Sequence, residues 1–569
     1  MLRLVKISLA ALAVAALSGQ ALAERGSDGQ LNILYWQAAS TMNPYLSGGT
    51  KDIEAGSLVL EPLAHYDENG DMVPVLVTEI PTVENGGVAE DLLSITWKLN
   101  PDIVWSDGTP LTADDVVFSG NYCLDPAGGC NAASFFTDVT SIEAVDAHTV
   151  KISFGVPKPY PYGPFVGSTA PVIQKAQFAD CLGAKAQECT DQNFAPIGTG
   201  PFKVVEFRAN DVVTLEANEN YRDPDKPAFQ TAVFKGGGDA ASAARAVLET
   251  GEFDYAWNLQ VEPEILDQMA QAGKGVIVTS FGTSVEQLIM NQTNPDPALG
   301  DNRSLYLDGT NPHPFLTDPA VGRALSLAID RQVLVDVGYG AAGQPGCNVL
   351  PAPAIYASDA NDECLTQDIE EANRILDDAG WVRGSDGIRE KDGVRLSILF
   401  QTSTNSVRQG TQALVKQMWE EIGVETELRN IDAAVFFGGD PASPDTYGKF
   451  YADIEMYTNN FDGTDPEKYM ANWACSEIPG PDNQWLGNNI QRSCSGDYDE
   501  LVAQMARTAS LEERAALARQ MNDMIAQNYW IIALIWRGDV SAHAVTLDGV
   551  RMNSWDSELW NVADWTRTD

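Results

Sequence analysis

Two aspartates, Asp462 and Asp465, lie within the stretch NNFDGTDPEKYMANW, which covers residues 459–473 and follows a run typical of a β-strand. Aromatic and amide side chains surround both of them. Carboxylates in such a setting can shape a turn, coordinate Ca²⁺ or hold a cationic ligand. A calcium loop built from both aspartates and Glu467 is interrupted by Pro466. A turn and a cation site therefore remain the two interpretations of Asp462.

The sequence around Asp465 is typical of a helix start, because an aspartate before a proline supplies an N-cap and a first helical residue. Asp465 is therefore expected to have a structural role. Asp462, which precedes Gly463, suits an Asx turn. It also follows the carboxyl end of a predicted strand, where open α/β folds bind their ligands. That position favours a ligand site at Asp462.

The chain begins MLRLVKISLAALAVAALSGQALA, with two basic residues, an apolar run and a small-x-small cleavage site. This pattern predicts a secretory signal peptide over residues 1–23. The first cysteine is Cys123, so the sequence gives no indication of a lipid anchor at the cleavage site. No later run reaches the ~18 uninterrupted apolar residues that a spanning helix needs. We expect a secreted, soluble protein of the periplasm.

Asp and Glu outnumber Lys and Arg by 80 to 36, and the formal net charge is −44. A field of this sign repels phosphate backbones, and the chain lacks basic patches that would release counterions from nucleic acid. Nucleic acid is therefore excluded as a partner. The acidity suits either a solvated surface that maintains solubility or a face that attracts cationic ligands over the ~8 Å that physiological salt allows.

The cysteines form four couples that are close along the chain, and an oxidising compartment favours a bond within each couple. The expected disulfides are Cys123–Cys130, Cys181–Cys189, Cys347–Cys364 and Cys475–Cys494. Each would cross-link a surface loop and raise the free energy of unfolding by ~2–3 kcal/mol, because it restricts the unfolded chain. A zinc site is the alternative, but CxxC-like spacing and neighbouring histidines are both missing from the sequence.

The hydrophobic pattern indicates an α/β protein of several domains. The Asn-Gly pair at 69–70 lies between two apolar runs and predicts a β-hairpin. Thr112, with an aspartate three positions later, predicts a capped helix start. A helical segment is expected over residues 318–340. Strand-like and helix-like runs alternate over residues 395–460, which favours helices packed on a largely parallel sheet.

Four segments resemble motifs of one protein family and occur in the order typical of that family. They are WKLNPDIVWSDGTPLTADDVVFS, PIGTGPFKVVEF, RALSLAIDRQVLVDVGYGAAGQP and ANRILDDAGW. Over nearly all of its mature length, the chain resembles the extracytoplasmic solute-binding proteins of the dipeptide/oligopeptide class of ABC importers, family 5. We interpret the motifs themselves as scaffold, including a close strand crossing at Gly198 and Gly200.

The resemblance implies an α/β, two-lobed periplasmic-binding-protein-like fold of type II, similar to cluster C, with an additional domain inserted in the first lobe. Lobe I is expected at residues 24–62, 198–283 and 538–569, its additional domain at 63–197 and lobe II at 284–537. The solute would be trapped between the lobes, through a higher affinity for the closed state. The closed form would meet the permease subunits of an ABC importer in the membrane. The protein is expected to act as a monomer, and no cofactor or metal site is assigned.

Peptide-binding members of the family carry an aspartate four residues before a proline that opens a helix, and this aspartate receives the α-ammonium group of the peptide. Asp462 holds that position relative to Pro466. The resemblance therefore implies that Asp462 binds the positive end of the ligand, in a cleft where an unpaired ammonium group would be costly. The further candidate ligand-binding residues are Asn459, Asn460, Phe461, Trp473, Tyr35, Trp36 and Tyr45.

The expected function is capture of a small solute, first of all a short peptide, and its delivery to the importer. Pairing with the peptide main chain would make the specificity loose. Oligosaccharides, or another amine or chelate solute, are the alternative, because aromatic rings stack on sugars and asparagines bond to hydroxyl groups. A secreted hydrolase is the remote alternative. The chain has only four histidines and lacks GxSxG and HExxH motifs, which argues against an enzyme.

Overall fold

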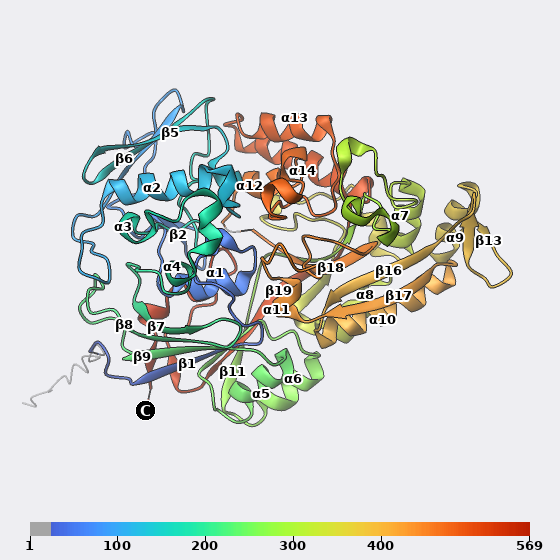
Figure 1. Cartoon of the computed structure of the whole chain (residues 1–569). Helices are drawn as coiled ribbons and strands as arrows, with labels where there is room; N and C mark the ends of the chain where they lie inside the picture. The colour runs from blue at the N-terminus through green and yellow to red at the C-terminus, as the bar shows by residue number, and fades with distance from the viewer. Residues whose placement is uncertain (1–23, 462, 569) are drawn as a thin grey trace, which may run out of the picture.

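One mixed sheet runs through the computed structural model, which describes residues 24–461 and 463–568. Its strands are β1 Gln30–Tyr35, β7 Phe202–Arg208, β8 Val212–Ala217, β9 Thr231–Gly236, β10 Tyr255–Trp257, β11 Gly275–Met290, β12 Gly343–Pro345, β16 Ser397–Ser403, β17 Glu425–Ile431, β18 Ile454–Asn459 and β19 Ile531–Ala544. The order is β17-β16-β18-β11-β19-β10-β1-β9-β8-β7, and β12 pairs with β19. The β11–β19 pair therefore lies between strands of the C-terminal half and strands of the N-terminal half (Figure 1).

The two long central strands, β11 and β19, are antiparallel and pair along nearly their whole length. A register shift interrupts the pairing between Phe281 and Val285. From Val285 onward β11 also pairs with β18, while the opposite end of β19 pairs with β10. Both long strands thus belong to both halves of the sheet, and the irregular segment 282–284 lies where the halves meet.

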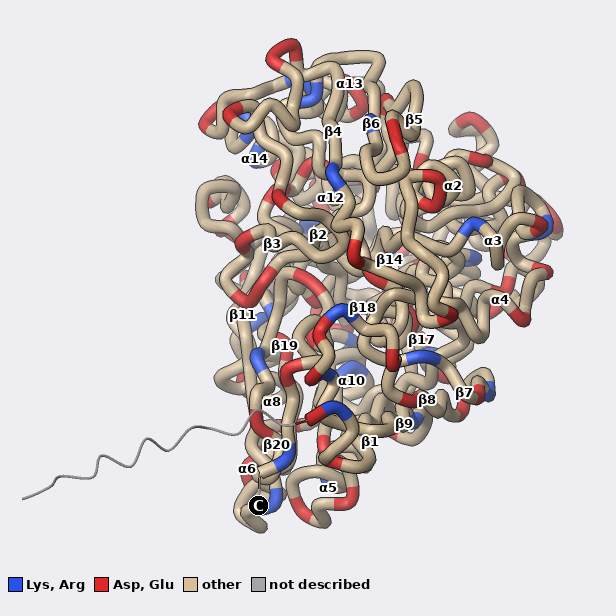
Figure 2. The backbone as a smooth tube through the Cα atoms, turned by 90° about the vertical axis from the view of Figure 1, so that its left-hand side faces the viewer, with Lys and Arg blue, Asp and Glu red and all other residues tan. Residues whose placement is uncertain are grey.

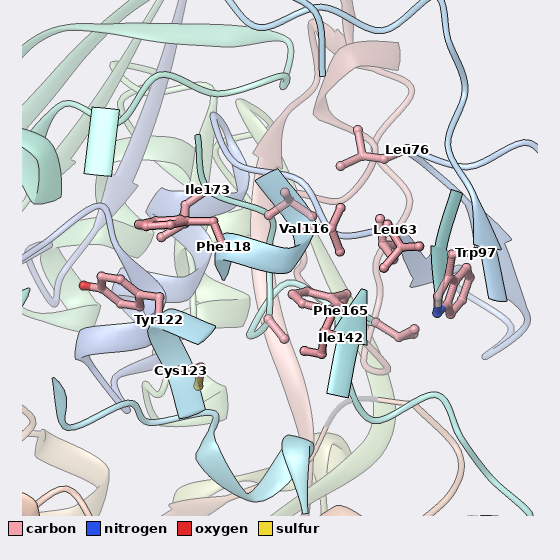
Figure 3. Close-up of a cluster of buried hydrophobic side chains, with 14 of the residues drawn as sticks. Leu63, Leu76, Trp97, Val116, Phe118, Tyr122, Cys123, Ile142, Phe165 and Ile173 are labelled. Carbon is pink, nitrogen blue, oxygen red and sulfur yellow. The ribbon is translucent and has the colours of Figure 1, made fainter. Parts of the chain in front are cut away.

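A separate layer with its own core is inserted between β1 and β7 (Figure 3). Its elements are β2 Ala64–Tyr66, β3 Met72–Pro74, β4 Ser94–Lys98, α2 Ala113–Leu124, β5 Val139–Asp146, β6 Thr149–Phe154, α3 Lys175–Phe178 and α4 Thr190–Phe194. The β2–β3 hairpin confirms the Asn-Gly prediction. Helix α2 begins as predicted, with Asp115 accepting a hydrogen bond from Thr112 N at 2.9 Å. Helix α2 places Val116 and Phe118 in the buried cluster with Phe165.

The other α-helices are α1 Thr50–Ser57, α5 Ala240–Leu248, α6 Pro263–Ala270, α7 Pro319–Leu327, α8 Arg331–Gly338, α9 Ile369–Asp378, α10 Ser406–Glu421, α11 Ala433–Phe436, α12 Glu467–Ala471, α13 Gly496–Met505 and α14 Leu511–Gln527. The segment 318–340 forms two helices, α7 and α8, because the Asp330 carboxylate accepts from Val333 N at 3.1 Å and starts a second helix. Strand β16 is parallel to β17 and β18, as the alternation predicts. The antiparallel β11 and β19 make the whole sheet mixed.

The remaining described strands are β13 Val382–Arg383, β14 Arg389–Lys391, β15 Val394–Arg395, β20 Leu547–Asp548 and β21 Thr566–Arg567. All four predicted disulfides are present, namely Cys123–Cys130, Cys181–Cys189, Cys347–Cys364 and Cys475–Cys494. Each bond joins residues that are 7 to 19 positions apart. The bonds therefore close local loops and do not tie the two halves together.

The chain passes very close to itself at Gly198, although neither Gly198 nor its neighbour Val59 lies in a strand as the predicted crossing requires. A Cβ atom on Gly198 would lie 1.8 Å from the carbonyl oxygen of Val59. The same oxygen accepts a hydrogen bond from Gly200 N at 2.9 Å, so it is held in place. Both groups belong to the backbone, and no change of side-chain rotamer relieves the overlap.

We therefore predict that Gly198→Ala lowers the free energy of unfolding by ~3 kcal/mol, since the backbone must shift to admit the methyl group. Gly410→Ala is the matched control, because a Cβ atom at Gly410 in α10 meets nothing within 4 Å. Helix propensity should make that variant more stable by ~0.5–1 kcal/mol. Urea denaturation of both variants measures the difference, and equal stabilities would contradict the steric account.

Candidate functional site

A cavity of about 240 Å³ is lined by residues from both halves of the chain. Three strands end at its wall. Gln37 follows β1, Trp257 is the last residue of β10, and Asn459 is the last residue of β18. The cavity therefore lies at the carboxyl ends of sheet strands, where open α/β sheets bind ligands.

The cavity wall combines amide and aromatic side chains. The amides are Gln37, Asn131, Asn258, Asn459, Asn460, Asn472, Asn488 and Asn553. The aromatic residues are Phe135, Trp257, Phe437, Tyr447, Tyr457, Phe461 and Tyr469. Such a wall offers both donors and acceptors for a polar ligand, together with flat apolar faces.

Arg408 and Arg537 form a positive region of this wall, and the buried Glu286 lies behind Arg408. Arg408 makes a buried, two-point contact with Glu286, with Nε–Oε1 and Nη2–Oε2 distances of 2.8 and 3.3 Å. Arg537 donates to Thr458 Oγ1 at 2.9 Å and to Asn258 Oδ1. Burial would raise the pKa of Glu286, but the neighbouring arginines hold it below the ordinary value. Two cations and one anion leave one net positive charge, which suits a ligand carboxylate.

The charge of the cavity wall changes from positive to negative along strand β19. Successive side chains of a strand alternate between faces, so Arg537, Asp539 and Ser541 share one face. Ser284, from the irregular segment of β11, donates to Asp539 at 3.0 Å. Ser541 donates to Glu558 Oε2 at 2.6 Å. The sign of the charge therefore changes along one face of a single strand.

Glu54 and Glu558 form the acidic end of the cavity. Glu54 Oε1 accepts from Glu558 N at 3.0 Å, and Glu558 Oε2 accepts from the Tyr255 hydroxyl at 2.5 Å. Burial raises the pKa of Glu54 to about 7. Burial and the nearby Glu54 carboxylate raise the pKa of Glu558 to about 8. Burial also raises the pKa of Asp539. The three acids are therefore more easily protonated than ordinary carboxylates.

Asp462 itself lies outside the described residues. On one side of it, the backbone N and O of Phe461 both bond to Thr283 Oγ1, at 3.0 and 2.9 Å. On the other side, Gly463 N donates to Trp555 O at 2.5 Å. The chain on both sides of this position is thus fixed close to the cavity. Three of the predicted ligand-binding residues line the cavity, namely Asn459, Asn460 and Phe461.

The other four predicted residues are buried and do not line the cavity: Tyr35, Trp36, Tyr45 and Trp473. Three of them support residues that do. Tyr35 stacks on Trp257 with 4.7 Å between ring centroids, Trp36 Nε1 donates to Asn258 O at 2.8 Å, and Trp473 packs edge-on against Tyr469. Tyr45 belongs to the core of the inserted layer. Direct ligand contact by these four residues stays a prediction that their burial does not favour.

Asp465 occupies the structural position that its sequence predicts. Its carboxylate accepts from Glu467 N at 3.0 Å and pairs with Arg514 of α14 at 2.5 and 3.1 Å. Helix α12 begins at Glu467, one residue later than the predicted start at Pro466.

The charged residues of the cavity wall were not among the predicted site residues. They are Arg408, Lys468, Arg537, Glu54, Asp539, Asp556 and Glu558. The sequence holds one usable signal for them, because YWIIALIWRGDVSAH carries two charges at alternate positions of an apolar strand. Glu54 and Glu558 carry no local signal, since about five hundred residues separate them and only the tertiary fold brings them together.

Comparison with known proteins shows what this chain is similar to. Residues 71–480 match the family model of bacterial extracellular solute-binding proteins, family 5 Middle. The glutathione-binding protein GsiB of Escherichia coli O1:K1 is 24% identical over 513 residues, which are 90% of this chain and 89% of GsiB.

Two solved structures share the fold over nearly the whole chain. The oligopeptide-binding protein AppA of Bacillus subtilis, in complex with a nonapeptide, aligns with a TM-score of 0.80 and 20% identity, covering 96% of this chain and 100% of AppA. NikZ of Campylobacter jejuni, in complex with Ni(L-His), aligns with a TM-score of 0.79 and 23% identity, covering 95% and 99%. The predicted fold class is therefore confirmed, whereas the predicted lobe boundaries stay a prediction.

We predict that the unliganded protein loses stability as the pH rises from about 6 to about 8.5. Glu54 and Glu558 have folded-state pKa values above the ordinary 4.5, so the folded state holds more protons than the unfolded chain in this range. Stability is then lost as these protons leave. Thermal unfolding across this range at constant salt measures the effect.

Glu558→Gln should flatten this pH dependence. The glutamine carbonyl can still accept from Tyr255 and Ser541, which both bond to Oε2, while the buried charge is removed. A parent melting temperature that stays constant or rises over the range would contradict the assignment.

Proposed function

Because the chain belongs to the bacterial extracellular solute-binding proteins of family 5, we propose that it captures a short peptide or peptide-like solute for an ABC importer. Proteins of this family are binding receptors of ABC transporters, so the hydrolase alternative is excluded. Family membership supports the receptor role, and the class of solute is proposed in addition.

One observation carries this proposal: a single cavity presents a positive region and an acidic region. A peptide can carry charges of both signs: its carboxylate suits Arg408 and Arg537, while a cationic group of the same molecule suits the acidic region. Buried charges are costly unless they are paired, so a neutral solute would leave those of the wall uncompensated. An amphoteric solute is therefore the best match in charge.

We assign the α-ammonium group of the solute to Asp462. The neighbouring Phe461 lines the cavity, and Asp462 keeps the spacing to Pro466 that the peptide-binding members show. Asn459 and Asn460, at the end of β18, would accept and donate to the peptide main chain. The ligands named for the three relatives support the class, since glutathione, a nonapeptide and Ni(L-His) are all built from amino acids.

Oligosaccharides are the second candidate, and the amides and aromatic rings of the wall favour them. Rings of this kind stack on sugar faces, and asparagine side chains bond to sugar hydroxyls. This candidate makes no use of the buried charges. Other amine or chelate solutes would use them as a peptide does.

The protein is proposed to act in the periplasm as a monomer, delivering its solute to permease subunits. Within residues 24–461 and 463–568, no helix has the length and apolar character to cross a bilayer. We propose lobe I at 24–62, 198–283 and 538–569, its inserted domain at 63–197 and lobe II at 284–537. The β11–β19 pair then forms the connection at which the lobes would move.

We predict that Asp462→Asn weakens the binding of a short peptide by well over tenfold, since losing one partner of a buried charge pair costs ~2–5 kcal/mol. Calorimetry with a peptide and its N-acetylated twin tests the assignment, and the parent protein should bind the acetylated form as weakly as the variant binds the free form. Asp482→Asn is the control, because Asp482 is exposed and lies outside the cavity wall.

Equal affinities of the parent protein for the two peptides would show that Asp462 does not bind the α-ammonium group. Binding of an oligosaccharide, with no binding of either peptide, would replace the peptide proposal by the second candidate.

A further inference from the structure

Glu54 and Glu558 are buried carboxylates that form no ion pair among the described residues. They are 3% and 6% exposed, and no described Lys, Arg or His nitrogen lies within 4.0 Å of either. Their hydrogen bonds come from hydroxyls and from backbone N–H groups, including Leu559 N on Glu54 at 3.4 Å. Two other buried carboxylates are paired, Glu286 with Arg408 and Asp465 with Arg514, whereas the buried Glu455 also lacks a cation within 4.0 Å among the described residues. Glu54 and Glu558 differ from Glu455 in lining a cavity that a solute can enter.

Two further acids extend this end of the wall. Asp539 and Asp556 both line the cavity, and neither forms an ion pair among the described residues. Asp556 accepts from backbone N–H groups, including Tyr66 N at 3.1 Å, whereas Asp539 accepts from the Ser284 hydroxyl at 3.0 Å and lies beside Ser554. Asp539 and Glu558 therefore line one space together with Glu54.

The arrangement is costly to the unliganded protein. Two carboxylates bridged by the Glu558 N–H to Glu54 bond repel one another when both are ionised, and burial removes the solvent that would screen them. Proteins keep such destabilising groups mainly where a ligand uses them. The missing component is a positive charge with several N–H donors.

We infer that Glu54, Asp539 and Glu558, together with Ser554, form a subsite for a cationic side chain of the bound solute, an alkylammonium or guanidinium group. The inference rests on the proposed function and narrows its solute class to peptides or peptide-like solutes that carry a basic group besides the α-ammonium group. The nearest cation along the strand, Arg537, donates instead to Thr458 and Asn258.

A metal ion is a poorer match for this subsite. Among the described residues, no group of three or more His, Cys, Asp or Glu side chains is arranged to hold a metal ion. Each of the two glutamates already accepts from protein donors, and the remaining acceptors suit the spread N–H groups of an organic cation.

Binding at this subsite should depend on pH. The ionisable groups that face Glu558 are Glu54, Asp539, Tyr255 and Tyr35, and Asp556 faces Glu54. Burial and the acidic neighbours raise the pKa of Glu558 to about 8. As the pH rises through the pKa values of Glu54 and Glu558, the subsite gains negative charge and its affinity for a cation increases. A bound cation therefore displaces protons, and calorimetry in buffers of different ionisation enthalpy measures their release.

The test compares alanine tripeptides that carry lysine at one position with twins that carry norleucine there. Norleucine keeps the methylene chain and lacks the ammonium group. Glu558→Gln removes the charge while its carbonyl can keep the hydrogen bonds from Tyr255 and Ser541. Glu427→Gln is the matched control, because it removes an equal charge from an exposed position on β17.

At about pH 8, the parent protein should bind one lysine peptide at least about tenfold more tightly than its norleucine twin. Glu558→Gln should bring this affinity ratio close to one and raise the melting temperature of the unliganded protein, whereas Glu427→Gln should leave the ratio unchanged. A purely structural role for Glu558 would not raise stability while removing selectivity.

Equal affinities of the parent protein for lysine and norleucine peptides at all three positions would overturn the subsite and leave the peptide proposal standing. An affinity ratio that survives in Glu558→Gln would also overturn it, because the basic group would then bind elsewhere. Failure of every peptide to bind would instead overturn the proposed function.

Discussion

The cavity depends on the antiparallel pairing of β11 with β19. These two strands run through both halves of the sheet, so they fix where residues of one half meet residues of the other. Their ladder breaks between Phe281 and Val285, and there Thr283 and Ser284 turn their hydroxyls to Phe461 and Asp539. A one-residue slip of β19 would move Arg537 and Asp539 to the opposite face and dismantle both charged regions of the wall.

The buried charges near the cavity differ in whether they are paired. Glu286 and Arg408 satisfy one another at 2.8 Å and contribute mainly a fixed geometry. Glu54 and Glu558 lack a cation and remain partly protonated near neutral pH, since burial raises the pKa values of both. The free energy that the unliganded protein loses by burying them becomes available when a cation arrives, so low intrinsic stability and selective binding have one physical cause.

Local signals in the sequence were sufficient for much of the fold. The hairpin at 69–70, the start of α2 and the four disulfides all depend on residues close along the chain. The strand β11 was not predicted, because Gly and Ser residues in GVIVTSFGTSVEQLIM weaken its pattern at the bulge. Tyr35, the last residue of β1, is buried against Trp257 and does not line the cavity, and a pattern that favours burial on both faces of a central strand does not tell wall residues from core residues. The acidic end joins residues from opposite ends of the chain, and no local pattern encodes such a contact.

The net charge of −44 likewise does not identify the residues that bind a ligand. Asp and Glu are spread over all parts of the tube in Figure 2, with fewer Lys and Arg among them. Exposed acids attract any cation, and salt confines that attraction to ~8 Å, so they favour solubility and encounter without selecting a solute. Buried acids act at contact, where the effective dielectric constant is low and an imperfect match is costly. In the proposed subsite Glu54, Asp539 and Glu558 would select the cationic side chain, and composition cannot identify them among the 80 acidic residues because it does not distinguish exposed carboxylates from buried ones.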